Sequence, residues 1–225
     1  MLNRLSIIIP CLNEAGVVDC LLESLQPLRQ AGHEVIIVDG GSRDATVQIA
    51  EPLVDQLLHS APGRAGQMNA GAAAANGALL WFLHADTALP VGAEKAVLSG
   101  IASGAIWGRF DVRLSGRHPL LRMVAFMMNL RSRWMGIATG DQAIFVRRDA
   151  FDEVGGFPDI PLMEDIVLSK RLKRAGKPYC VRLRLITSSR RWETRGIFHT
   201  IVLMWWLRLL FALGASPGQL ARWYS

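Results

Sequence analysis

The first hundred residues alternate between short, continuous apolar runs and helical patterns, and this alternation constrains the fold most strongly. A helix is expected from Val17 to Leu28, because apolar residues recur at helical spacing and Gly32 suits its C-terminal cap. Residues 46–58 are also predicted to be mostly helical, with a kink or a restart at Pro52. The apolar runs predict three buried strands, Leu5–Ile9, Val35–Asp39 and Ala78–Leu83. Such strands, separated by helices, favour a parallel sheet covered on both faces.

The second half of the chain has a different pattern. Residues 106–114 alternate between apolar and polar side chains, which predicts a strand with one polar face that is antiparallel or at a sheet edge. Residues 120–134 form an apolar helical pattern, and residues 164–175 predict a helix whose acidic start and basic end suit the helix dipole. Residues 179–186 alternate again. We expect one domain with two halves that join after residue 100.

Charge is distributed unevenly along this chain of 225 residues. The formal net charge is +6, but residues 177–225 carry +7 and residues 1–176 carry −1. A near-neutral body without a recognised nucleic-acid module argues against a nucleic-acid partner and favours a local site for phosphate or anionic lipid. The three cysteines cannot build a disulfide framework, so we expect a reducing compartment and a cytoplasmic protein.

The only long apolar segment, residues 197–213, barely reaches the length of a membrane span and contains His199 and Arg208 on roughly opposite helical faces. Two interpretations stay open. The segment packs on the core or at a homodimer contact, or it docks with Trp205 and Trp206 at the inner face of the membrane as a peripheral element.

Polar residues follow each predicted strand, where ligands bind in open parallel sheets. Pro10 and Glu14 flank the turn after the first strand. After the second, the Asp39 carboxylate can accept from a base or a ribose hydroxyl, and Gly41 permits close backbone approach. After the third, His84 and Asp86 point the same way in an extended chain, so both can reach one metal ion. An Asp with phosphate oxygens suits Mg²⁺ or Mn²⁺, and the His84 imidazole suits Mn²⁺ better than Mg²⁺. Each motif alone also fits an ordinary turn or helix cap.

Four further groups are candidates on local chemistry. Arg64 and Asn69, in a Gly-rich stretch, can touch a ligand, although Asn69 can equally fix backbone. Glu164 and Asp165 open a helix, where acids usually cap, but a carboxylate facing a cleft can deprotonate a hydroxyl. The remaining candidates are the stretch Gly140, Asp141 and Gln142, assigned to the acceptor, and the group Arg190, Arg191 and Trp192, whose guanidinium forks match phosphate oxygens.

The order and spacing of these motifs resemble the family 2 glycosyltransferases of the GT-A fold, over roughly residues 5–192. The resemblance is carried by residues 9–14, 38–44, 84–86, 155–157 and 164–165. It implies an α/β, Rossmann-like three-layer sandwich. It also implies a nucleotide-sugar-binding half at residues 1–104 and an acceptor and catalytic half at residues 105–192, followed by an apolar, basic tail at residues 193–225.

The resemblance also implies roles for individual residues. Pro10 and Glu14 border the nucleotide, and Asp39 binds uracil or ribose. Asp86 matches the last acid of the family's Asp-x-Asp motif, which holds a divalent cation, Mn²⁺ or Mg²⁺, on the donor diphosphate. Asp165 matches the catalytic base, with Glu164 beside it. Residues 190–192 look like a shortened form of an Arg/Gln-x-x-Arg-Trp motif near the diphosphate.

Two residues depart from the family pattern, since Gly40 and His84 stand where acids are usual. The expected activity is inverting transfer of a sugar from a nucleotide diphosphate sugar to an acceptor hydroxyl with help from the cation. The alternatives are an inactive nucleotide-sugar-binding relative and a membrane-docked transferase with a lipid-linked acceptor. Small size, the His-Ala-Asp variant and the Gly-Asp-Gln stretch resemble a compact bacterial subgroup associated with arsenosugar-type or radical-SAM-linked gene clusters.

Overall fold

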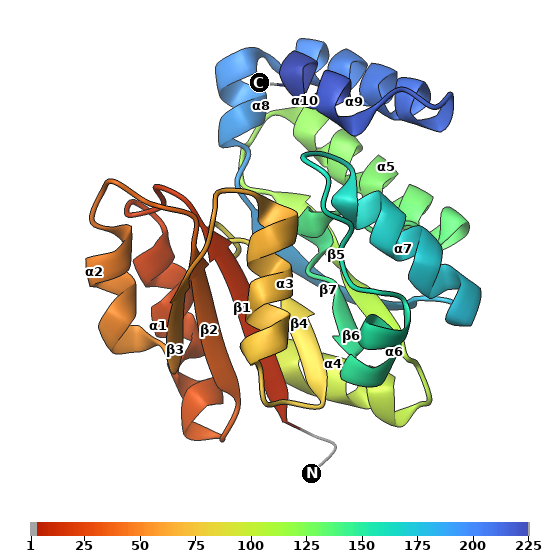
Figure 1. Ribbon diagram of the computed structural model, residues 1–225. Coiled ribbons are helices and arrows are strands. Elements are labelled where there is room, and N and C mark those ends of the chain that lie inside the picture. The colour runs from red at the N-terminus through yellow and green to blue at the C-terminus, as the bar shows by residue number, and fades with distance from the viewer. Residues whose placement is uncertain (1–3, 225) are drawn as a thin grey trace.

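A seven-stranded sheet forms the centre of the computed structural model, which describes residues 4–224, and its strand order is β3-β2-β1-β4-β6-β5-β7 (Figure 1). The strands are β1 (Leu5–Cys11), β2 (Glu34–Asp39), β3 (Gln56–His59), β4 (Leu79–Phe82), β5 (Trp107–Leu114), β6 (Phe145–Arg147) and β7 (Tyr179–Thr187). Only β6 is antiparallel to its neighbours, β4 and β5, within the described chain. The predicted mostly parallel sheet is confirmed.

Helices cover both faces of the sheet, because alternate residues of β1 enter two separate cores. Ile7 and Ile9 pack with α1 and α4, whereas Ile8 packs with α3, α6 and α7. The expected three layers are therefore confirmed. The helices are α1 (Val18–Gln30), α2 (Thr46–Ala50), α3 (Arg64–Ala74), α4 (Ala93–Ala102), α5 (Pro119–Met135), α6 (Arg148–Glu153), α7 (Glu164–Ala175), α8 (Arg190–Arg195), α9 (Ile197–Ala212) and α10 (Pro217–Tyr224), with short 3₁₀ turns η1 (Glu51–Leu53) and η2 (Gly140–Gln142).

The helix predicted over residues 46–58 is wrong in its second half. Helix α2 ends at Ala50, one 3₁₀ turn carries Pro52, and the chain then enters β3 at the sheet edge. Pro52 has no N–H and cannot donate the hydrogen bond that would continue the helix. A few residues later the Asp55 N–H donates to the Val35 carbonyl of β2, which starts the pairing of β3 with β2. Strand β3 is only half-buried, so its apolar pattern is weak.

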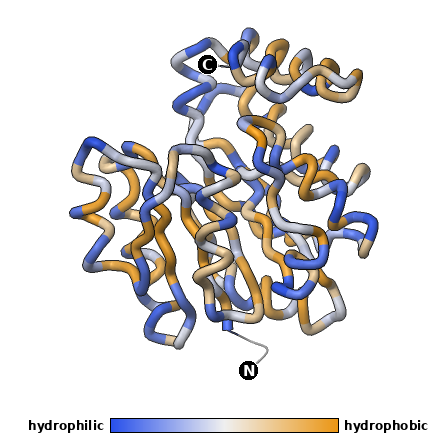
Figure 2. Tube along the Cα trace, in the orientation of Figure 1, coloured by the Kyte–Doolittle hydropathy of each residue, from blue (hydrophilic) through white to orange (hydrophobic). Residues whose placement is uncertain are grey.

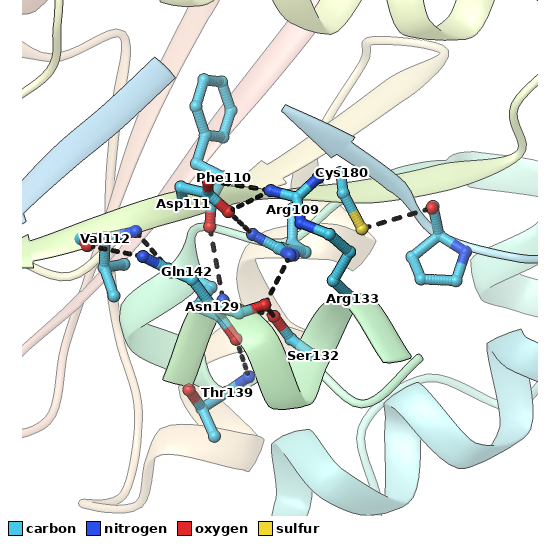
Figure 3. A network of polar contacts seen from close by, with 11 residues as sticks. Arg109, Phe110, Asp111, Val112, Asn129, Ser132, Arg133, Thr139, Gln142 and Cys180 are labelled. Carbon is cyan, nitrogen blue, oxygen red and sulfur yellow. Dashed lines mark hydrogen bonds and ion pairs between the residues drawn. The ribbon is translucent and has the colours of Figure 1, made fainter. Parts of the chain in front are cut away.

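Most of the polar face predicted for residues 106–114 is buried inside the protein, with Arg113 as the exposed exception. Strand β5 lies between β6 and β7, so the expectation of an edge strand is wrong, although β5 does run antiparallel to β6. Arg109 is fully buried and forms an ion pair with Asp111, which also accepts two hydrogen bonds from Arg133 of α5 (Figure 3). Asn129 of α5 bonds both the N–H and the carbonyl of Val112. Helix α5 thus supplies hydrogen bonds to both Arg109 and Asp111 of the predicted polar face.

Helices α8, α9 and α10 lie beyond the carboxyl ends of the strands and above the body of the protein (Figure 1). Leu207 of α9 and Leu220 of α10 are fully buried against Met163 and Ile166 at the start of α7. The tail therefore packs on the body of the protein, which is the first of the two interpretations of the apolar segment at residues 197–213. Across residues 4–224, none of the helices combines the length and the apolar character needed to cross a membrane.

Removing the carboxylate of Asp111 should destabilise the fold strongly. Asp111→Asn leaves the buried Arg109 guanidinium without its counter-charge, and breaking a buried pair in this way costs about 3–5 kcal/mol. Urea denaturation measures the loss. The matched control is Asp149→Asn, whose partner Arg147 is 43% exposed, and it should change stability by less than about 1 kcal/mol. Equal effects of the two variants would contradict this account of β5.

Candidate active site

A cavity of about 710 Å³ lies at the carboxyl ends of β1 and β4, beneath α8, α9 and α10. Most of the residues singled out from the sequence line it together, although they come from distant parts of the chain. They are Pro10, Glu14, Arg64, His84, Asp86, Gly140, Asp141, Asp165, Arg190, Arg191 and Trp192. The parallel topology is what gathers the ends of β1 and β4 at one edge.

Glu14, Asp86 and Arg190 form the first charged group of the cavity. Arg190 Nη2 lies 3.6 Å from Glu14 Oε2, and that oxygen has no hydrogen-bond partner among the described residues. Burial raises the pKa of Glu14, and the negative charge of Asp86 raises it further against the opposing effect of Arg190. This end of the cavity holds two carboxylates in each other's field, so it favours additional positive charge.

The loop that carries Glu14 is fixed to the loop after β2 and to the start of α2. The Glu14 N–H donates to Thr46 Oγ1 at 2.8 Å, and the Asn13 N–H donates to Ser42 Oγ at 2.8 Å. The Asn13 side chain in turn accepts from the Arg43 N–H. Asn13 therefore ties two strand ends together, in a left-handed backbone conformation that asparagine tolerates better than most residues.

Asp165 defines a second charged group, at the first turn of α7. Its Oδ2 accepts the Gly140 N–H at 2.8 Å and its Oδ1 accepts the Ile166 N–H at 2.7 Å. A Cβ at Gly140 would lie 2.6 Å from His84 Nε2, so the close approach of η2 to His84 requires glycine. His84 Nδ1 lies 3.3 Å from Asp141 Oδ1. The turn η2 therefore orients Asp165 and His84 at the same time.

Glu164 lies beneath the cavity and does not line it. Its carboxylate is buried and lies 3.3 Å from Arg64 Nε, which does line the cavity. Burial raises the pKa of Glu164, and Asp165 raises it further while Arg64 opposes the shift. Glu164 is thus placed to hold Arg64, and only Asp165 of the acidic pair faces the cavity.

Four other predicted site residues also lie outside the cavity lining, and their polar side chains mostly bond backbone. The Asp39 carboxylate accepts the N–H groups of Gly41 and Ser42 at 2.9 and 3.0 Å. Asn69 bonds the N–H and the carbonyl of Phe157. Gln142 is fully buried and donates to Ser132 Oγ and the Phe110 carbonyl (Figure 3). Asp39, Gly41, Asn69 and Gln142 therefore shape the loops around the cavity.

Residues of the tail complete the cavity, and the sequence motifs did not identify them. The lining includes Thr200, Met204 and Arg208 of α9 and Tyr224 of α10. The Arg191 guanidinium stacks on the Tyr224 ring at 3.7 Å. Apolar residues surround most of helix α9, so the sequence does not indicate which face of the helix turns toward the cavity. The one sequence feature that could have identified this face is the isolated charge of Arg208.

This sheet topology and the cavity at its carboxyl edge define a GT-A-type fold, and comparisons with known proteins agree. The chain belongs to glycosyl transferase family 2, whose model matches residues 6–155. It is 31% identical over 172 residues to a PGL/p-HBAD biosynthesis glycosyltransferase of Mycobacterium bovis, covering 68% of this chain and 62% of that protein. It is 30% identical over 191 residues to the succinoglycan biosynthesis protein ExoA of Rhizobium meliloti, covering 76% and 58%. The chain thus spans about 60% of the length of these relatives.

Solved structures share the fold at low sequence identity. S. aureus TarS 1-349 superimposes with a TM-score of 0.67 at 17% identity, covering 83% of this chain and 60% of TarS. The mannosyltransferase PcManGT from Pyrobaculum calidifontis, in complex with GDP-Man and Mn²⁺, gives a TM-score of 0.60 at 19% identity and covers 81% and 56%. These similarities confirm the expected fold.

Proposed function

We propose that this protein transfers a sugar from a nucleoside diphosphate sugar to an acceptor hydroxyl and inverts the anomeric carbon. The observation that carries the proposal is one cavity lined by both charged groups, Asp86 with Glu14 and Arg190, and Asp165 near Gly140. The TarS and PcManGT structures, solved with UDP-GlcNAc and with GDP-Man and Mn²⁺, support this reading of the donor. Residues 1–104 then serve mainly the donor, and residues 105–192 mainly the acceptor. Membership of the arsenosugar-type subgroup stays a prediction.

In this proposal the first charged group holds the donor diphosphate. Arg190 and Arg191 bind phosphate oxygens, and Asp86 would hold a divalent cation. Glu14 Oε2, which accepts no hydrogen bond within the described residues and lies in the field of Asp86, fits such a cation. No cluster of three or more His, Cys, Asp or Glu side chains within residues 4–224 could hold a metal alone. Oxygens from outside the chain, such as those of the diphosphate, would therefore complete the ligand set. When bound, a divalent cation stabilises the charge of a leaving diphosphate.

Asp165 acts as the general base. Its carboxylate, oriented by the Gly140 N–H, takes the proton of the acceptor hydroxyl as that oxygen attacks the anomeric carbon from the face opposite the diphosphate. The bond to the diphosphate breaks as the new glycosidic bond forms, and the arginines stabilise the leaving charge. Direct displacement inverts the anomeric carbon and needs no covalent enzyme intermediate.

The donor site should respond to nucleotides in a thermal-shift panel of UDP, GDP, dTDP and CDP with Mn²⁺. A nucleotide at about 100 times its Kd stabilises the folded state by roughly 2.7 kcal/mol. Asp86→Ala should lose most of the Mn²⁺-dependent part of this stabilisation, because it removes the carboxylate assigned to the cation. Absence of a response to all four nucleotides, or an Asp86→Ala variant that responds like the wild type, would contradict the donor assignment.

Asp165→Asn should lower the turnover of the nucleotide sugar about 10²–10⁴-fold, the range that general bases contribute. Nucleotide affinity should be retained, because Asp165 lies at the other charged group. Release of nucleoside diphosphate from the donor measures turnover, and Asp159→Asn, at an exposed loop position, is the matched control. A near wild-type rate would exclude Asp165 as the base. Nucleotide-sugar binding without any release by the wild type would favour the inactive-relative alternative.

A second candidate, a transferase docked on a membrane surface, is favoured by one observation. Large apolar side chains of α5 and α9 are exposed, and Figure 2 shows α9 as a mainly hydrophobic segment along the edge of the molecule. We call this surface the apolar face: Met123, Phe126, Trp134, Phe198, Val202, Trp205, Trp206, Leu209 and Leu213. Helices α5, α9 and α10 contain arginines and no acidic residue. Apolar area bordered by positive charge suits an anionic lipid surface.

Full-length protein should therefore float with phosphatidylglycerol vesicles in a density gradient and less with phosphatidylcholine vesicles. The double variant Trp205→Ser/Trp206→Ser should lose most of this binding, because it removes two aromatic side chains that are 64% and 54% exposed. Val91→Ser, which removes an exposed apolar residue outside these helices, should bind like the wild type. Failure to float together with a concentration-dependent dimer would assign the apolar face to a homodimer contact instead.

A further inference from the structure

Within residues 4–224, Arg131 of α5 and Arg208 of α9 form neither an ion pair nor a side-chain hydrogen bond. The buried Nε and Nη2 atoms of Arg131 and the buried Nε of Arg208 make no hydrogen bond with any part of the chain that the structure describes. Arg208 lines the cavity. Since buried polar groups are nearly always hydrogen-bonded, and a buried unpaired charge is costly, the two side chains need an explanation.

The other inward-facing arginines of this region do have partners. Arg64 lies 3.3 Å from Glu164, Arg190 lies 3.6 Å from Glu14, and Arg109 forms an ion pair with Asp111. Lack of a counter-charge is thus specific to Arg131 and Arg208 within this set, and not a general feature of the cavity walls.

The two guanidinium groups also act on one another. Burial, followed by repulsion from Arg208, lowers the pKa of Arg131 to about 10. Burial likewise lowers the pKa of Arg208, with Asp165 and Asp141 opposing the shift. Both side chains are only partly exposed, so water screens this repulsion incompletely, and a ligand that supplies negative charge would relieve it.

The nearby carboxylates are already engaged elsewhere. Asp165 accepts the N–H groups of Gly140 and Ile166, and Asp141 lies 3.3 Å from His84. Neither carboxylate forms an ion pair with Arg131 or Arg208 in the described structure, although both act on Arg208 electrostatically. A ligand that enters the cavity can therefore supply the counter-charge that Arg131 and Arg208 lack among the described residues.

We propose that Arg131 and Arg208 bind a phosphate monoester carried by the acceptor, which places the acceptor hydroxyl near Asp165. This inference rests on the proposed function. Two fixed positive charges match a phosphate monoester, which carries a charge of about −1.5 to −2 at pH 7, and guanidinium forks fit phosphate oxygens in pairs. Arg208 contacts the phosphate from the cavity wall, and Arg131 reinforces the positive charge there.

The position of the pair favours the acceptor over the donor diphosphate. Arg208 interacts electrostatically with Asp165 and Asp141. Arg190 interacts instead with Glu14, which also feels the charge of Asp86. The donor thus has arginines of its own at the first charged group. A phosphate on the acceptor can occupy the second group while the donor occupies the first.

The test uses the full chain with its donor site filled. Saturating nucleoside diphosphate and Mg²⁺ are added first, and phenyl phosphate is then titrated by calorimetry. The wild type should bind phenyl phosphate, and Arg208→Gln should weaken it at least about tenfold, the effect of losing one charged hydrogen bond. Arg208→Lys should weaken it less than Arg208→Gln. Arg222→Gln, an exposed arginine of α10, removes the same charge and should have no effect.

A second variant separates binding from folding. Arg131→Met should weaken the binding of phenyl phosphate. It should also raise the melting temperature of the free protein, because it removes one of two partly buried charges that repel each other. Lack of phenyl phosphate binding in a protein that still binds the nucleotide would overturn this inference alone, and so would binding that Arg208→Gln leaves unchanged. Equal binding of phenylacetate would overturn the assignment to phosphate. Lack of nucleotide binding would instead overturn the proposed function.

Discussion

Parallel pairing of β1 with both β2 and β4 is the constraint on which the site depends. It aligns Cys11 with Asp39 and Ile8 with Phe82, so three strands end at one edge of the sheet. Each strand end is followed by polar residues, and hydrogen bonds from Asn13 and Glu14 to the loop after β2 join two of these ends. The apolar interior of the sheet therefore determines where the charged groups meet.

The antiparallel strand β6 adds the second half of the site to this edge. The turn η2, just before β6, brings Gly140 against His84 and gives its N–H to Asp165. Behind it, the buried Arg109–Asp111–Arg133 network attaches α5 to β5. Helix α5 then supports α9, so the tail helices that cover the cavity depend on a polar cluster inside the protein.

The sequence predicts the strands of the sheet centre well, because fully buried strands are continuous apolar runs. It fails at β3, a half-buried edge strand hidden in a helical pattern. It does predict β5 as a strand, but not its place inside the sheet, where Asp111 pairs with Arg109 of the same strand and with Arg133 of α5. Period-two alternation reports that one face is polar and cannot report what covers that face. A buried ion pair and an exposed one leave the same pattern.

The same limit applies to the site. Motif order predicted that Glu14, Asp86, Asp165 and Arg190 belong together, and the cavity contains all four. It could not separate residues that face the cavity from residues that hold its loops, since Asp39 and Asn69 have the same polar groups in either role. Arg208 was not assigned to the site because the mainly apolar helix α9 gives no sign of which face turns inward, and Tyr224 of α10 belongs to no motif.

The central claim is that one cavity binds the donor at Glu14, Asp86 and Arg190 and leaves Asp165 free for the acceptor. A crystal structure with Mn²⁺ and the most strongly stabilising nucleoside diphosphate tests it most directly. The account predicts the diphosphate beside Asp86 and Arg190, with open space in front of Asp165. A nucleotide bound elsewhere, or a diphosphate in contact with Asp165, would contradict it.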